Sequence, residues 1–178
     1  MINEITPTVH GQKVTTNQEH SIYNSIIDDE EMNHQIVSVI DEVGDVQGKT
    51  TNVKAQMTEW NMSYKPGFIK LLYYFSEIIK EISFNDYKRT FGMIIKDMWG
   101  MKYKSGDYAL AHDHWPAVWS MSYYISPPEN GPNIVFPNSN YQVNPVNGLM
   151  CIFPAYVKHK VEKKEFEGYR YVVSANGY

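Results

Sequence analysis

The spacing of apolar residues changes near residue 90, and this change constrains the fold more than any other feature of the chain. Before it, residues 29–43 and 66–82 each place apolar side chains three and four positions apart, as one face of a helix requires. Acidic residues open the first segment and Pro66 opens the second, and both are favourable at a helix N-terminus. After residue 90 the period falls to two, which is the period of a strand.

Short runs separated by turn residues fill the second half of the chain. Gly, Pro and Asn mark the breaks, for example at Pro127-Pro128 and Asn147-Gly148. The expected strands are residues 92–103, 107–114, 117–126, 133–137, 148–154, 158–164 and 169–175. Such a series is typical of sandwiches, barrels and jelly rolls. We therefore expect a mainly β protein, a double-stranded β-helix (jelly roll) supported by about two to three helices. It would form a single domain over 1–178, with helical support over about 1–90 and the jelly-roll core over about 91–178.

Composition removes several function classes. At 178 residues with 43% hydrophobic and 20% charged residues, the chain is long and apolar enough to fold as one globular domain. Its net charge is -4 without a Lys/Arg block, so we expect no nucleic-acid partner. No apolar stretch is long enough to span a membrane and no signal-like segment opens the chain. The single Cys151 suits a reducing compartment, so the expected location is the cytoplasm.

Three histidines fall within the expected strands. His112 and His114 are two positions apart, so in a strand both side chains point to one face and both can reach one metal ion. Asp113 points to the other face unless a bulge turns it. His159, from a later strand, would complete three ligands. A His-x-His pair is a weak signal by itself, and two alternatives stay open: three histidines, which the spacing favours, or Asp113 in place of His114.

Short motifs surround these histidines in a recognisable order. They are Tyr103 with Gly106-Asp107-Tyr108 before His112-x-His114, then 122-SYYI-125, 135-VFP-137, 148-GLMCIFP-154, His159-x-Val161, and Arg170 ahead of Ser174-x-Asn176. Together they resemble the core of the 2-oxoglutarate/Fe(II)-dependent dioxygenases, specifically the prolyl-hydroxylase-like and related small phage and bacterial members. The resemblance covers about residues 95–178, with a weaker likeness over 52–60.

The resemblance implies a non-haem Fe(II) site. His112 matches the first metal histidine of the family, and His159 matches the distal one. The family carries a carboxylate ligand at the position of His114, so this chain departs from the pattern there, with Asp113 one residue early. Three neutral imidazoles also suit zinc, which binds three histidines and water in other proteins.

The same resemblance implies residues that bind the cosubstrate. Arg170, eleven residues after His159, matches the residue that holds the far carboxylate of 2-oxoglutarate. A planar, permanently charged guanidinium suits that carboxylate better than an ammonium group. Tyr103 and Tyr123 match tyrosines that hydrogen-bond the cosubstrate, and Asn176 is expected close to them.

The implied activity is hydroxylation of a prolyl or other peptidyl side chain, or of a small molecule, with succinate and CO2 as coproducts. Fe(II), 2-oxoglutarate and O2 would take part, with ascorbate as a reductant. Trp115 and Trp119 would border the substrate pocket, and the cell would be bacterial or phage-infected. Two alternatives remain. The first is a cupin-like jelly roll without redox activity, which binds a metal or ligand or has a structural role. The second is a zinc enzyme with the same three histidines. Arg170 with its tyrosines is the feature that favours the oxygenase.

Overall fold

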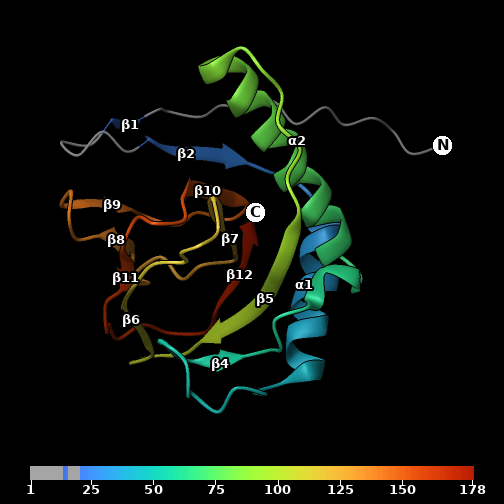
Figure 1. The fold of residues 1–178 in the computed structure, drawn as a ribbon. Coiled ribbons are helices and arrows are strands. Elements are labelled where there is room, and N and C mark those ends of the chain that lie inside the picture. Colours follow the sequence, from blue (N-terminus) through green and yellow to red (C-terminus); the bar gives the residue numbers. More distant parts are fainter. Residues whose placement is uncertain (1–13, 16–20) are drawn as a thin grey trace.

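Two antiparallel sheets and two helices make up the computed structural model, which describes residues 14–15 and 21–178 (Figure 1). The helices are α1 (Glu30–Val43) and α2 (Phe68–Tyr87), with a short 3-10 helix η1 (Met62–Tyr64) before α2. The strands are β1 (Val14–Thr15), β2 (Ser21–Ile26), β3 (Val53–Lys54), β4 (Gln56–Met57), β5 (Ile95–Tyr103), β6 (Tyr108–His112), β7 (Trp119–Ile125), β8 (Ile134–Phe136), β9 (Tyr141–Val143), β10 (Leu149–Pro154), β11 (His159–Val161) and β12 (Arg170–Gly177).

The strand order is that of a jelly roll. The major sheet has seven strands in the order β1-β2-β10-β7-β12-β5-β4, and the minor sheet has five in the order β3-β6-β11-β8-β9. From β6 to β12 the chain crosses repeatedly between the two sheets, so strands distant in sequence become neighbours. The predicted jelly roll supported by helices is confirmed.

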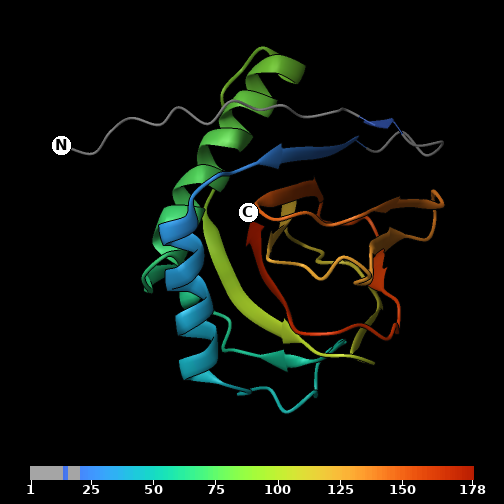
Figure 2. The same ribbon diagram turned by 180° about the vertical axis from the view of Figure 1, so that it is seen from behind.

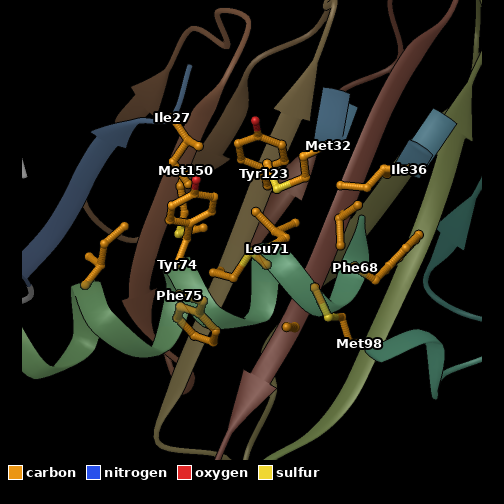
Figure 3. Packing of buried hydrophobic residues seen from close by; sticks show 14 of the residues in the cluster. Ile27, Met32, Ile36, Phe68, Leu71, Tyr74, Phe75, Met98, Tyr123 and Met150 are labelled. Atoms are coloured by element: carbon orange, nitrogen blue, oxygen red, sulfur yellow. The ribbon is translucent and has the colours of Figure 1, made fainter. Parts of the chain in front are cut away.

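Both helices pack on the outer face of the major sheet (Figures 1 and 2). Asp29 caps α1 by accepting a hydrogen bond of 3.1 Å from the backbone N–H of Met32, which satisfies one of the free donors of the first turn. α2 lays Phe68, Leu71 and Phe75 across the strands (Figure 3). Among the described residues, no helix combines the length and the apolar character that crossing a membrane requires.

Gly100 allows α1 to approach the major sheet closely. A Cβ atom built on Gly100 would lie 2.4 Å from Cγ1 of Ile40 in α1 and 3.2 Å from Cζ of Phe68 in α2. Any larger residue would push both helices away from β5. The spacing between the helical layer and the sheet therefore depends on this glycine.

All seven expected strands and both expected helices are present, although their ends differ. α2 continues to Tyr87 rather than residue 82, and the expected strand 158–164 pairs only over His159–Val161. The expectation that the first ninety residues are helical support is incomplete, because β2, β3 and β4 come from this half of the chain. β3 and β4 have two residues each, too few to show a period. Residues 1–13 and 16–20 of the predicted support lie outside the described residues.

The inner face of the major sheet looks toward the minor sheet. Cross-strand pairing aligns Tyr103 with Arg170, and Val172 with both Met101 and Tyr124. Met101, Tyr103, Tyr124 and Val172 belong to the second of two apolar clusters, which lies between the sheets, whereas the first lies under the helices. The inner face carries the polar groups that make up the candidate site.

Candidate metal and cosubstrate site

Three imidazoles meet at one end of the space between the sheets. His112 ends β6, and His159 begins β11 in register with it. His114 follows two residues after β6, held by a 2.7 Å hydrogen bond from its backbone N–H to the carbonyl of Ala155. One ligand nitrogen from each imidazole lies within 4.8 Å of the other two, and the Nε2 atoms of His114 and His159 are 3.3 Å apart. This grouping, termed the histidine triad below, is compatible with one metal ion.

Hydrogen bonds orient two of the rings. Nδ1 of His112 lies 2.6 Å from the carbonyl oxygen of Leu110, and Nδ1 of His159 lies 3.1 Å from that of Val157. A proton on Nδ1 donates to each carbonyl, which leaves the lone pair on Nε2 for a metal. Such outer hydrogen bonds fix the tautomer that ligation needs.

The third ring is held by a side chain of β12. Nδ1 of His114 lies 3.5 Å from the amide nitrogen of Asn176, whose Oδ1 accepts a 2.8 Å hydrogen bond from the Ser120 hydroxyl. Asn176 therefore stands behind His114, on the side away from the other two imidazoles. Sequence reasoning expected Asn176 near the cosubstrate; the structure places it against a member of the histidine triad.

The imidazoles are neutral at physiological pH. Burial lowers the pKa of His112, and burial together with the neighbouring His112 lowers the pKa of His114 to about 4. The pKa of His159 falls well below its usual value for the same reasons. Only the neutral form offers a lone pair to a metal, so His112 and His159 are in the ligating state. The amide N–H of Asn176 on Nδ1 of His114 leaves the proton of that ring on Nε2, so His114 must change tautomer before its Nε2 can bind a metal.

Asp113 does not join the histidine triad. Its side chain is exposed, and its Oδ1 accepts a 3.2 Å hydrogen bond from the backbone N–H of Trp115. Of the two alternatives left open by the sequence, the structure brings His114 together with His112 and His159, and turns Asp113 toward solvent. The alternation of side chains along the strand end is the physical reason.

Arg170 begins β12 and is fully buried, with 1% of its surface exposed. Its guanidinium carbon lies 4.9 Å from the ring centre of Tyr103 and 5.0 Å from that of Tyr124. None of its Nε, Nη1 and Nη2 atoms has a hydrogen-bond partner among the described residues. A buried guanidinium without an anion is costly, so this group is suited to an anionic ligand.

Arg170 and the triad line one cavity between the sheets. Ser122 and Ser174 lie along the same cavity, with Tyr103 and Tyr124 at the arginine end. Burial, opposed by the Arg170 charge, raises the pKa of Tyr103 to about 12, so its hydroxyl stays protonated and able to donate. The cavity volume is about 30 Å³, so a dicarboxylate enters only if side chains along the wall move. We call this space the inner cavity.

Tyr123 is not part of this site, which corrects the sequence prediction. Its hydroxyl donates a 2.8 Å hydrogen bond to Oδ1 of Asn33 in α1, on the helical side of the major sheet. Its neighbour Tyr124 points to the inner face and stacks on Arg170. Successive residues of a strand face opposite ways, so the two tyrosines cannot share one role.

Of the two tryptophans expected at the substrate pocket, one lies at the site and the other lies on the helical side of the major sheet. Trp115 lies beside His112 and His114 at the mouth of the site and is 76% exposed. Trp119 packs edge-on against Tyr23, with ring centres 5.8 Å apart, and borders an apolar pocket near the end of α2. The expectation for Trp119 is wrong, because the strand turns it toward the helices.

Sequence reasoning missed Trp60, Trp99 and Tyr124. Trp99 lines the site, and it shares its strand face with Tyr103, four positions along β5. The period of two would have found it. Trp60 precedes η1 and packs on Trp99 with ring centres 4.7 Å apart. No local pattern predicts that contact.

Comparison with known proteins gives a match in structure rather than in sequence. No protein-family model matches the chain, and no curated protein is significantly similar to it in sequence. A Pseudomonas putida prolyl-4-hydroxylase superposes with a TM-score of 0.68 at 13% identity, over 90% of this chain and 93% of that chain. A viral collagen prolyl hydroxylase from Paramecium Bursaria Chlorella virus-1, solved as its 2OG complex, gives 0.61 at 15% identity, over 86% and 94%.

A third solved structure includes a bound peptide. A prolyl hydroxylase from Trichoplax adhaerens, in complex with a peptide fragment of the hypoxia inducible factor oxygen degradation domain, superposes with a TM-score of 0.59 at 14% identity. The match covers 89% of this chain and 83% of that chain. At this level of identity the comparisons speak for the fold. The chain thus shares its fold with these prolyl hydroxylases, and it carries a three-histidine cluster at one end of the space between its sheets.

Proposed function

We propose that the chain is a non-haem Fe(II)- and 2-oxoglutarate-dependent dioxygenase that hydroxylates a peptidyl side chain or a small molecule. The observation that carries the proposal is the position of Arg170. It is a fully buried cation without a hydrogen-bond partner among the described residues, and it lines the same cavity as the histidine triad. A metal at one end and a guanidinium at the other suit a dicarboxylate that bridges them.

The chain contributes binding, orientation and exclusion of water. His112, His114 and His159 would hold Fe(II) through neutral imidazole nitrogens. Arg170 would take the far carboxylate of 2-oxoglutarate, with its guanidinium carbon 4.9 Å and 5.0 Å from the ring centres of Tyr103 and Tyr124. Iron, when bound, supplies the activation of O2. In the net reaction one oxygen atom enters a substrate C–H bond, the other enters succinate, and CO2 leaves.

Zinc is the competing metal because three histidines suit it equally well. Activation of water by zinc does not by itself need a buried guanidinium near the triad, whereas a dicarboxylate cosubstrate calls for a cationic partner that can bind its far carboxylate. The same group argues against a jelly roll that is only structural, since burying an unpaired charge would merely destabilise the fold. Arg170 therefore favours the oxygenase over both alternatives.

The test is anaerobic reconstitution with Fe(II), followed by addition of 2-oxoglutarate. We expect a visible charge-transfer band, and on admission of O2 with ascorbate we expect succinate to accumulate. Zn(II)-loaded protein serves as the redox-inactive control. The proposal fails if the Fe(II) protein gives neither the band nor succinate.

A matched pair of histidine variants assigns the signal to the triad. His159→Ala should lose the band, because it deletes one ligand of the site. His34→Ala removes an exposed histidine of α1 and should leave the band unchanged. Equal effects of the two substitutions would contradict the assignment.

A further inference from the structure

A second pocket, termed the outer pocket, opens beside the histidine triad. Its volume is about 260 Å³, and it shares His112 and His114 with the inner cavity but does not include Arg170. A substrate held there lies next to the metal position without displacing the cosubstrate. The volume is below the roughly 300–1,000 Å³ typical of pockets for whole drug-sized ligands. It therefore fits one side chain or one short alkyl group.

Indole rings form part of the wall of the outer pocket, together with the polar side chains of Thr51, Asn52 and Asn176. Trp60, Trp99 and Trp115 all line it. Trp99 connects the wall to the triad, because its ring centre lies 5.7 Å from that of His114. Trp60 is 41% exposed and Trp115 is 76% exposed, so two large indoles face solvent at the mouth. Exposed indole faces in a pocket bind either apolar groups or cations.

Charge distinguishes these two classes of ligand. Asp113 is the charged side chain that lines the outer pocket, and no Lys or Arg does so among the described residues. A 3.2 Å hydrogen bond from the backbone N–H of Trp115 orients the Asp113 carboxylate, and both side chains line the pocket. Two lysines lie near without entering: Lys96 covers the ring of Tyr178 at 4.9 Å, and Lys54 donates to the carbonyl of Thr51 at 2.7 Å.

We propose that the outer pocket selects a substrate bearing an aliphatic cation, an ammonium or guanidinium group a few methylenes from the oxidised carbon. The indoles would contact the methylene stem and the cation, and Asp113 would pair with the charge. This inference rests on the proposed oxygenase function and narrows its substrate class. A lysine-like or arginine-like side chain of a peptide and a free alkylamine share this chemistry.

Matched probes test the selection. With Mn(II) and 2-oxoglutarate present, calorimetry would compare acetyl-glycyl-lysyl-glycine amide with its norleucyl analogue, which lacks the ammonium group. We expect the lysyl peptide to bind roughly fivefold tighter or more, since exposed cation–π and ion-pair contacts each add less than one order of magnitude. Equal or weaker binding of the lysyl peptide overturns the inference. Pentylamine distinguishes a free amine from a peptidyl substrate. Binding equal to that of the lysyl peptide indicates that the alkyl cation suffices, and weaker binding indicates a peptidyl substrate.

Two variants locate the effect. Asp113→Asn should reduce the preference for lysyl over norleucyl to about twofold or less. Glu129→Gln, an exposed change of the same charge in the loop after β7, should leave the preference intact. A preference that survives Asp113→Asn contradicts the role of the carboxylate.

Failure of the substrate-class proposal can be distinguished from failure of the proposed oxygenase function. Binding of 2-oxoglutarate is measured first, by the charge-transfer band of the anaerobic Fe(II) protein. Absence of that band, together with absence of succinate formation in O2, refutes the oxygenase. A normal band without preference for the lysyl probe refutes only the substrate class.

Discussion

Replacing Arg170 with methionine should stabilise the ligand-free protein while it abolishes affinity for 2-oxoglutarate. The guanidinium is fully buried, and its three nitrogens lack hydrogen-bond partners among the described residues. Methionine has a similar length and no charge, so it fills the space without the cost of desolvating an ion. A binding residue such as Arg170 is expected to destabilise the ligand-free protein when its interaction partner is supplied by the ligand.

The magnitude follows from two opposing contributions. Burying an unpaired ion costs several kcal/mol even after the protein relaxes. The rings of Tyr103 and Tyr124, at 4.9 and 5.0 Å, return about 1–2 kcal/mol each through cation–π attraction. The net gain for Arg170→Met is then about 1–3 kcal/mol. For a chain of this size, each kcal/mol raises Tm by roughly 2–4 °C.

Thermal unfolding with and without 2-oxoglutarate, in the presence of Mn(II), measures both effects. At a ligand concentration of 100 Kd the wild-type protein should gain about 2.7 kcal/mol, and the variant should gain none. The Arg170→Met variant should therefore be more stable than the wild-type protein without ligand, and equally or less stable when ligand is added. Arg89→Met, which alters the other arginine of the chain at an exposed site, should change stability by less than about 0.5 kcal/mol.

Two results would refute this reasoning. One is an Arg170→Met protein that is less stable than wild type by more than about 1 kcal/mol without ligand, which would mean that the charge is already satisfied. The other is a variant that keeps the ligand-induced rise in Tm, which would place the cosubstrate elsewhere.

Two further substitutions test the layers around the site. Tyr124→Leu should weaken 2-oxoglutarate binding several-fold, because Arg170 loses the ring whose centre lies 5.0 Å from its guanidinium carbon. Tyr123→Phe should leave binding unchanged but lower the free energy of unfolding by about 1–3 kcal/mol, because Asn33 loses a buried hydrogen bond. Titration with 2-oxoglutarate and urea unfolding separate the two effects, and a reversed pattern would be evidence against the inner-face assignment. Gly100→Ala should destabilise by about 1–3 kcal/mol because its Cβ would meet Ile40 at 2.4 Å, and an unchanged urea midpoint would contradict that packing.

The fold was predictable because its signals are local. The period of two after residue 90 predicted the strands, and the apolar stripes of 29–43 and 66–82 predicted the helices. Strands β3 and β4 were not predicted, because a segment of two residues shows no period. They form because they pair with β6 and β5. The histidines at i and i+2 were predictable as neighbours for the same local reason.

The choice between Tyr123 and Tyr124 shows where local reasoning stops. β7 is covered by helices on one face and by the minor sheet on the other, and six of its seven residues are buried. The strand does alternate, because Trp119, Met121 and Tyr123 share one face while Ser120, Ser122 and Tyr124 share the other, but burial of both faces hides which of them carries the site. Only the pairing of β7 with β12, which sets Tyr124 opposite Val172, resolves it.

The amino-acid sequence by itself therefore determined the element types, the histidine pair and the presence of Arg170 eleven residues after His159. Tertiary structure alone decided that His159 meets that pair, that Arg170 is buried against the rings of Tyr103 and Tyr124, and that Trp60 reaches the mouth of the site. The reason is physical. Periodicity records which way a side chain points within its own element, whereas contacts between strands distant in sequence depend on how the two sheets close over one another.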